Sequence, residues 1–281
     1  MIDIHAHILP GIDDGPRNMD ESIAMLRLAV ADGIRTMVAT PHYDGADPGL
    51  PCLASATMRE TRRQIAEHGL DLQVLSGFEL SLTPELINRF DDWESLGLNG
   101  SRYLLIECPV AYWSDYVEEG LFRLQAAGMR PILAHAERYD SIIDDIEVAN
   151  RLASRDILLQ VNADSLTGSR GRDHARCARA LVKRGIVSFL ATDSHSPRSR
   201  SPHLHRAAGV AARLIGSEAA ERLVASNPHA VLNNAEIPEP PPIRRFAFFS
   251  TLSRSLKTER QPIPEHPTTM TPAVSIVKTR G

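Results

Sequence analysis

Short apolar runs alternate with longer amphipathic stretches along most of the chain. The apolar runs cover residues 2–4, 36–40, 72–77, 103–106, 131–134, 157–161 and 187–191, and each predicts a β-strand. Between the first two runs, Ile23, Leu26 and Val30 recur at helical spacing after a helix start predicted at Asn18. Strands separated by helices of about 10–15 residues predict parallel βαβ units.

Helical spacing continues after the later runs and predicts a helix after almost every strand. We expect helices at residues 54–67, from Pro84 onward, and at 116–127, 146–152, 174–184, 203–215 and 218–225. Side chains that bind metals follow nearly every strand in turn. This order favours a closed ring of strand ends around one site, because an open sheet gathers ligands only at a switch point. The expected fold class is therefore α/β, a distorted (β/α) barrel of seven strands.

Nine candidate metal ligands lie at the ends of six predicted strands. They are His5, His7, Asp14, His42, Glu79, Glu107, His135, Asp193 and His195. His5 and His7 are two residues apart on a strand and therefore point to the same face. A single ion uses about four to six protein groups, so we predict two or three adjacent ions with Glu79 as a bridge.

The predicted ligand set also indicates which ions and which chemistry to expect. Imidazole mixed with carboxylate suits Mn²⁺, Fe²⁺ or Zn²⁺, and adjacent ions of this kind activate water for phosphoryl transfer. Any one histidine alone is more often packed or solvated than a ligand, and only the joint placement favours a metal site. The remaining histidines are expected to have structural or surface roles: His68, His174, His203, His205, His229 and His266.

Composition narrows the classes of function. The chain has 281 residues and a net charge of −4, which gives no electrostatic case for nucleic-acid binding. Three cysteines without a C-x-x-C pair suit a reducing cytoplasm and argue against a disulfide framework. We find no secretory signal and no run of about 20 apolar residues that would span a membrane. A cytoplasmic protein is expected.

The chain changes character after residue 236. Residues 237–242 read IPEPPP and predict a stiff linker, so the barrel is assigned to residues 1–236 and a linker with a tail to residues 237–281. From residue 243 onward there are seven Lys or Arg against two Glu and no helix–strand rhythm, which predicts disorder. Residues 244–249 mix bases with aromatic side chains, so peripheral contact with a membrane surface or a partner is an alternative.

Two other hydrolase chemistries fit the sequence poorly. A cysteine-dependent tyrosine phosphatase needs an arginine six residues after its thiolate, but that position holds Met58 after Cys52, Ser114 after Cys108 and Lys183 after Cys177. Many amidohydrolases also begin with His-x-His but bridge two metals through a carbamylated lysine at a strand end. The only lysines here are Lys183 on a predicted helix and Lys257 and Lys278 in the tail, which weakens that alternative without excluding it.

Several motifs of the chain resemble those of a known family. MIDIHAH at 1–7, DDGP at 13–16 and TPH at 40–42 are similar to motifs of polymerase-and-histidinol-phosphatase (PHP) proteins. HAERY at 135–139, TDSH at 192–195 and RSPH at 200–203 narrow the resemblance to the bacterial metal-dependent protein-tyrosine phosphatases of capsule and exopolysaccharide synthesis. The resemblance extends from residue 1 to about residue 233.

This resemblance implies a distorted seven-stranded barrel, a trinuclear manganese site formed by the same nine ligands, and a tyrosine autokinase as substrate. It also implies that Arg138 and Arg200 bind phosphate, although Arg198 in the same loop is an alternative to Arg200. The expected reaction is direct attack by metal-activated hydroxide on phosphotyrosine. A small-molecule phosphatase such as histidinol-phosphate phosphatase, and a scaffold that binds phosphotyrosine without turnover, are the alternatives.

Overall fold

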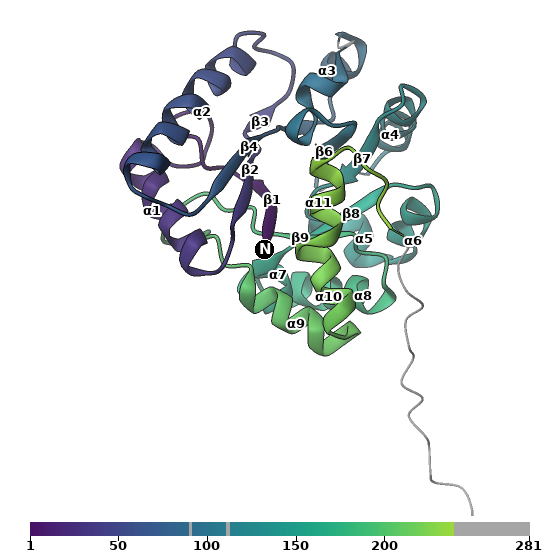
Figure 1. Ribbon diagram of the computed structural model, residues 1–281. Coiled ribbons are helices and arrows are strands. Elements are labelled where there is room, and N and C mark those ends of the chain that lie inside the picture. Colours follow the sequence, from purple (N-terminus) through teal and green to yellow (C-terminus); the bar gives the residue numbers. More distant parts are fainter. Residues whose placement is uncertain (90–91, 111–112, 239–281) are drawn as a thin grey trace, which may run out of the picture. The chain divides into compact units, whose positions relative to one another are not determined.

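The computed structural model describes residues 1–89, 92–110 and 113–238 (Figure 1). Its strands occur where the apolar runs predict them, with two additional short segments. They are β1 (Ile2–Ala6), β2 (Thr36–Ala39), β3 (His42–Tyr43), β4 (Gln73–Ser76), β5 (Glu79–Ser81), β6 (Tyr103–Glu107), β7 (Arg130–Leu133), β8 (Leu158–Asn162) and β9 (Phe189–Ala191). Every paired strand in the described part of the chain is parallel to its neighbour, as the βαβ pattern predicts.

The described strands form two curled sheets, so the expected single ring of seven strands is not confirmed. One sheet has the order β1-β2-β4, and the other has the order β3-β5-β6-β7-β8-β9. The predicted strands at 36–40 and 72–77 each stop early, and the chain resumes as β3 and β5. Pro41 lies in the first break and has no N–H for a ladder. Gly77 lies in the second, where a Cβ would come 2.8 Å from Leu98 Cδ2.

Main-chain hydrogen bonds link the first strand to the segment that follows the last one. Asp193 N donates to His5 O at 2.8 Å, and His7 N donates to Ser194 O at 2.8 Å. A parallel bridge between Ala6 and Ser194 lies between these two bonds. The curled sheets therefore bring residues 193–195 beside the end of β1.

Helices surround the curled sheets (Figure 1). They are α1 (Met19–Ala31), α2 (Leu50–Glu67), α3 (Pro84–Arg89), α4 (Asp115–Ala126), α5 (Asp140–Asp144), α6 (Glu147–Ser154), α7 (Ala163–Thr167), α8 (Arg172–Arg184), α9 (His205–Ile215), α10 (Ser217–Val224) and α11 (Ser226–Leu232). Short 3₁₀ turns are η1 (Trp93–Leu96), η2 (Leu98–Gly100) and η3 (Ala136–Arg138). Asn18 caps α1 as predicted, accepting from Glu21 N at 3.0 Å. By contrast, α5, α7 and α11 have no counterpart among the predicted helices.

Two clusters of buried apolar side chains stabilise this arrangement. The larger one packs the helices against the strands. The smaller one combines residues of β1, β2, β6, β7 and β9 with Leu98 of η2 and with Val231 and Leu232 of α11. α11 is thereby fixed against the strands, and Ile237 packs on the same cluster.

The predicted division of the chain at residue 236 is left open by the structure. Of the predicted linker, Ile237 and Pro238 are described. The rest of it and the predicted tail at 243–281 lie outside the described residues, so these assignments stay predictions. Within the described part of the chain, no helix combines the length and the apolar character that a membrane span requires.

Candidate metal centre

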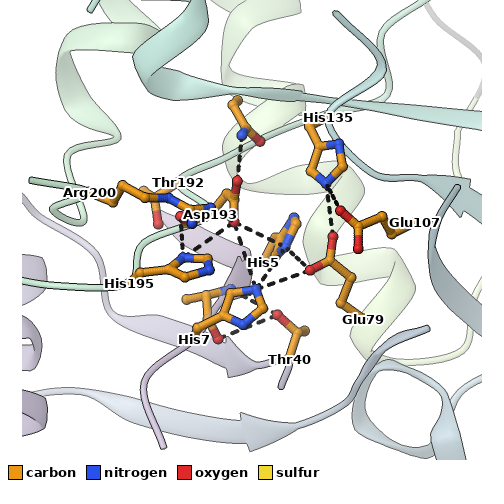
Figure 2. A network of polar contacts seen from close by, with 12 residues as sticks. His5, His7, Thr40, Glu79, Glu107, His135, Thr192, Asp193, His195 and Arg200 are labelled. Carbon is orange, nitrogen blue, oxygen red and sulfur yellow. Dashed lines mark hydrogen bonds and ion pairs between the residues drawn. The ribbon is translucent and has the colours of Figure 1, made fainter. Parts of the chain in front are cut away.

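The predicted metal ligands converge on one place, although they come from distant parts of the chain. Figure 2 labels all of them except Asp14 and His42. His5 lies in β1 and His7 just after it, His42 and Glu79 begin β3 and β5, Glu107 ends β6, His135 follows β7, Asp193 and His195 follow β9, and Asp14 lies in the turn before α1. The strands therefore assemble the site from their ends, as the ring arrangement predicts.

Glu79 lies at the middle of the cluster. Its Oε2 is 3.2 Å from His5 Nε2, 3.1 Å from His7 Nε2 and 3.2 Å from His42 Nδ1. Its Oε1 is 3.0 Å from His135 Nε2. One carboxylate thus faces four imidazoles through both of its oxygens, which is the arrangement that a bridging ligand requires.

The ligand atoms divide into three overlapping groups within which all atoms lie no more than 4.8 Å apart. The groups are His7, Asp14, His42 and His195; His5, His7 and Asp193; and His42, Glu79 and Glu107. His135 joins the last group through Glu79 and through Glu107, whose Oε1 is 3.3 Å from His135 Nε2. The geometry is compatible with more than one ion.

The cluster has a buried floor and an open rim. The side chains of His5, His7, Glu79 and Asp193 are at most 2 % exposed. On the rim, Asp14 is 62 % exposed, His42 35 % and Glu107 25 %. A substrate therefore has access to the ligands from the side of Asp14, His42 and Glu107.

The buried imidazoles and carboxylates shift each other's pKa values. Burial lowers the pKa of His7, but hydrogen bonds to Asp13 and Glu79 outweigh this effect and raise the pKa to about 10. Burial favours neutral Glu79, yet the charge of His5 and hydrogen bonds from His135 hold its pKa well below the usual range. Ionised carboxylates at the buried floor of the cluster stabilise positive charge. Protonated imidazoles supply this charge until a bound cation displaces their protons.

Imidazole orientation provides a test of whether these residues fit metal ions. His5 Nδ1 lies 3.1 Å from Gln160 Oε1, and His7 Nδ1 lies 2.6 Å from Asp13 Oδ2. Both oxygens are acceptors, so each Nδ1 carries a proton, and each Nε2 offers its lone pair to a cation once that cation has displaced any second proton. The two Nε2 atoms face each other at 3.3 Å. Two acceptor nitrogens directed at one point are the arrangement that a shared cation stabilises.

His195 supports the same conclusion from the opposite side of the cluster. Its Nδ1 lies 2.9 Å from the main-chain oxygen of Asp193, which again directs the lone pair of Nε2 inward. Nε2 is buried, lies 3.1 Å from Asp14 Oδ1 and forms no hydrogen bond there. His195 Nε2 and Asp14 Oδ1 are therefore placed as two ligands of one ion would be. The residues present therefore fit divalent cations.

Three polar residues that sequence reasoning did not identify as part of the site hold the predicted ligands in place. Asp13 accepts from His7, and its Oδ1 accepts from Gly15 N at 2.9 Å. Gln160 Oε1 accepts from His135 N at 2.8 Å, and Asn162 Nδ2 donates to Asp193 Oδ2 at 2.7 Å. Asn162 directly follows a predicted strand and Asp13 belongs to the DDG turn, whereas nothing in the sequence distinguishes Gln160.

The main chain is also unusual at two of the ligands. His135 has φ 35° and Asp193 has φ 52°, which are left-handed values rare for residues other than glycine. Each residue directly or closely follows a strand, and the left-handed turn directs its side chain into the cluster. Backbone strain at such positions is typical of functional sites.

The two predicted phosphate-binding arginines lie beside Asp193. Arg200 Nη2 is 2.6 Å from Asp193 Oδ1, and Arg138 Nη1 is 3.5 Å from Asp193 Oδ2. Both guanidinium groups are about a quarter exposed, at 26 % and 24 %. Arg198, the alternative in the same loop, is exposed, and its main-chain N–H donates to Ser196 Oγ at 3.3 Å. Arg200 and Arg138 are thus placed at the edge of the cluster.

Other candidate residues lie away from this cluster. His203 Nδ1 is 3.5 Å from Asp32 Oδ1 and is 58 % exposed, and His174 lies on α8. Lys183 is exposed on α8, so among the described residues no lysine occupies a strand end as a bridging carbamate would require. Cys108 and Cys177 are buried, and burial raises the pKa of both thiols.

Comparison with known proteins identifies tyrosine-protein phosphatases as relatives of this chain. Tyrosine-protein phosphatase YwqE of Bacillus subtilis is 32% identical over 254 residues, which cover 89% of this chain and 100% of that protein. Tyrosine-protein phosphatase CpsB of Streptococcus pneumoniae is 30% identical over 241 residues, which cover 83% of this chain and 98% of that protein.

A solved structure extends the likeness to the fold. It comes from a study of YwqE of Bacillus subtilis and CpsB of Streptococcus pneumoniae, described there as unique metal-dependent tyrosine phosphatases. The match has a TM-score of 0.79 and 32% identity, and it covers 86% of this chain and 98% of the solved one. Residues 1–233 also match the family model described as capsular polysaccharide synthesis, CpsB/CapC. The chain therefore belongs to the CpsB/CapC family.

Proposed function

We propose that this chain is a metal-dependent tyrosine-protein phosphatase. The observation that carries the proposal is the convergence of nine imidazole and carboxylate side chains, with two arginines at their edge. The names of the relatives support it, because YwqE and CpsB are tyrosine-protein phosphatases. Hydrolysis of a phosphate monoester is the reaction for which such a set of groups is suited.

Two or three Mn²⁺ ions are the proposed cofactor, with Fe²⁺ or Zn²⁺ as alternatives of similar ligand preference. The ligands would be the nine residues of the cluster, with Glu79 bridging. When bound, such ions supply Lewis acidity and an activated water. The chain itself fixes the imidazole lone pairs through Asp13 and Gln160, which keeps the ligand set preorganised.

Arg138 and Arg200 are proposed to bind the phosphate. A planar guanidinium donates two parallel hydrogen bonds to phosphate oxygens and offsets the charge that grows in the transition state. Their position beside Asp193 places them next to the ligand cluster without making them part of it. Tyrosine, with a pKa of about 10, is a better leaving group than an alkyl alcohol and needs less protonation.

The proposed substrate is a tyrosine autokinase that regulates capsule or exopolysaccharide synthesis. The family description, capsular polysaccharide synthesis, supports this assignment. We place the protein in the cytoplasm. The three free cysteines support a reducing compartment.

We also propose that the strands represent a distorted barrel with seven positions. β2 with β3, and β4 with β5, would each be one interrupted strand, since Gly77 N donates to Ala39 O and Glu79 N to Pro41 O across the breaks. The bonds between β1 and residues 193–194 would close the ring. This arrangement explains why ligands from all parts of the chain meet at one end.

Hydrolysis of a phosphotyrosine peptide beside histidinol phosphate, with and without Mn²⁺, tests the proposed function. We expect metal-dependent turnover that strongly favours the peptide. Preference for histidinol phosphate would instead support a small-molecule phosphatase. Tight binding of the peptide without turnover would support a phosphotyrosine-binding scaffold.

Metal dependence is tested on the same preparation. Exhaustive chelation should abolish turnover, Mn²⁺ should restore it, and elemental analysis should find more than one ion per chain. His42→Ala, Glu107→Ala and Asp193→Ala should each lower the metal content, because each removes a ligand atom. Full activity after chelation would exclude the proposed chemistry.

A further inference from the structure

A third arginine, Arg170, is directed at the candidate metal centre. It lies in the loop between α7 and α8, a region that supplies none of the predicted metal ligands. Its Nη2 is 4.0 Å from Asp193 Oδ2, and its side chain is 26 % exposed, the same fraction as Arg200. Arg138, Arg170 and Arg200 therefore all approach the carboxylate of Asp193.

The guanidinium of Arg170 is held in place by a dedicated partner. Its Nε donates to Asp164 Oδ2 at 2.8 Å, and Asp164 follows β8 after one residue. The loop that carries Arg170 is folded back on the same residue, because Gly168 N and Ser169 N donate to Asp164 O at 3.0 and 2.9 Å. Asp164 therefore fixes both the loop and the direction of the guanidinium.

The end of this guanidinium has no acceptor of its own. Arg170 Nη2 is buried and forms no hydrogen bond with the described residues. The 4.0 Å to Asp193 Oδ2 is too long for a hydrogen bond, and that oxygen already accepts from Asn162 at 2.7 Å. A buried donor without an acceptor is costly, so an anion that supplies the missing acceptor would be stabilised here.

Three guanidinium groups gather around Asp193. They face the carboxylates of Asp193 and Asp164, and Arg200 Nη1 also lies 3.9 Å from Asp14 Oδ2. A phosphate dianion has enough charge and enough acceptor oxygens for all three arginines.

We propose that Arg170 is a third phosphate-binding arginine of this site and that Asp164 is the positioning residue that directs it. The inference rests on the proposed phosphatase function and adds a contact that neither the sequence motifs nor the comparisons assign. Arg170 binds the phosphate of the substrate together with Arg138 and Arg200. Asp164 acts only through Arg170.

The first experiment measures phosphate binding by the metal-loaded protein. We expect Arg170→Ala to raise the Kd for inorganic phosphate, measured by calorimetry, by about 10- to 100-fold, the usual loss for one hydrogen bond to a charged group. kcat/KM for p-nitrophenyl phosphate should fall by a similar factor. Arg172→Ala, two residues away and exposed, is the matched control and should change neither value.

Metal content and thermal unfolding separate this role from two others. If Arg170 instead positions Asp193 for metal binding, the Arg170→Ala variant will contain less metal than the wild type, and the proposal is overturned. If it only stabilises the loop, the Tm will fall while phosphate binding stays as in the wild type, which also overturns it. The proposal requires unchanged metal content together with weakened phosphate binding.

A double-mutant cycle tests the role of Asp164. Asp164→Ala should weaken phosphate binding less than Arg170→Ala, and in the Arg170→Ala background it should have no further effect. Additive losses in the double variant would show that Asp164 acts independently of Arg170. If Arg200→Ala loses activity while Arg170→Ala does not, this inference fails but the phosphatase function stands. A wild-type protein that neither binds nor hydrolyses phosphate esters with any metal would exclude both.

Discussion

Asp193 is the residue at which the predicted metal ligands and the proposed phosphate-binding arginines meet. One of its oxygens contacts Arg200 and also lies 3.5 Å from His5 Nε2. Its pKa is lowered, because the charges of His5, His135 and Arg200 outweigh the effect of burial. A buried carboxylate that stays ionised can bind a cation together with the imidazoles and can also pair with the arginines. Substitutions around it should therefore separate metal binding from phosphate binding.

The arginines provide that separation. Arg138→Ala or Arg200→Ala should leave the metal content unchanged, because a guanidinium does not coordinate metals. Removing one preorganised charge at the transition state should lower turnover by roughly 100- to 1,000-fold, about 3–4 kcal/mol. Steady-state kinetics checks this expectation, and a rise in KM with unchanged kcat would indicate ground-state binding alone.

Arg198→Ala is the internal control for Arg200→Ala. Both arginines lie in the loop after β9, but only Arg200 contacts Asp193. Arg198 is exposed, and its variant should be clearly milder. If Arg198→Ala proved the more damaging change, the assignment of Arg200 to the phosphate would be wrong.

The cysteines allow a chemical test of the reaction class. Burial, together with the charge of Glu107, raises the pKa of the Cys108 thiol, and burial raises that of Cys177. A raised pKa keeps a thiol protonated and unreactive at neutral pH. Iodoacetamide should therefore label Cys52, the exposed cysteine, and leave turnover unchanged. Mass spectrometry of the labelled protein checks the site, and inactivation in step with labelling of Cys52 would contradict a metal-dependent reaction.

Residue type determined which parts of the site the sequence could predict. Histidines and carboxylates that recur at successive strand ends seldom do so by coincidence, so the nine candidates could be named from their order alone. Asp13 and Arg170 contact His7 and Asp164 only six residues away, but Gln160 acts through a contact between distant segments. Gln160 is separated from His5 by 155 positions, and its role depends on how β8 and β1 pack. No local pattern encodes such a contact.

At the level of elements, the apolar runs predicted where the strands lie but did not predict where two of them are interrupted. The break at Pro41 reflects a missing N–H that the sequence itself shows. The break at Gly77 depends on a close approach to Leu98, which only the packed structure reveals. α2 begins at Leu50, four residues before the predicted start at residue 54, because Pro51 is tolerated in the first turn of a helix. α11 lacks a long amphipathic pattern and is held by packing on the smaller core cluster.

The loop with Arg200 is anchored by a contact between two helices. Asp32, at the end of α1, accepts from Leu204 N at 2.6 Å and from His205 N at 2.7 Å and so caps α9. Asp32→Ala should lower stability by about 1 kcal/mol, or about 2–4 °C in Tm for a domain of this size. Thermal unfolding measures the effect. Asp71→Ala, which removes an exposed ion pair with Arg35, is the control and should change Tm less. Equal changes would show that the cap does not stabilise α9.

At the scale of the whole molecule, all predicted site residues lie at or before Arg200, and the described fold continues to Pro238. Ile237 still packs on the smaller core cluster. A cut after residue 242 therefore removes no predicted ligand, no arginine of the site and no described core residue. Residues 1–242 should therefore be active, unless the site requires a contact with residues 243–281.

Deleting residues 243–281 should leave turnover of p-nitrophenyl phosphate nearly unchanged. A chain ending at residue 225 is the control, because it also loses Val231 and Leu232 from the smaller core cluster and should fail to fold. Circular dichroism and steady-state kinetics measure both variants. Loss of catalysis in the first variant would show that the tail packs on the catalytic part. Unchanged catalysis with weaker binding to anionic vesicles would instead assign the basic and aromatic residues 244–249 to a membrane surface.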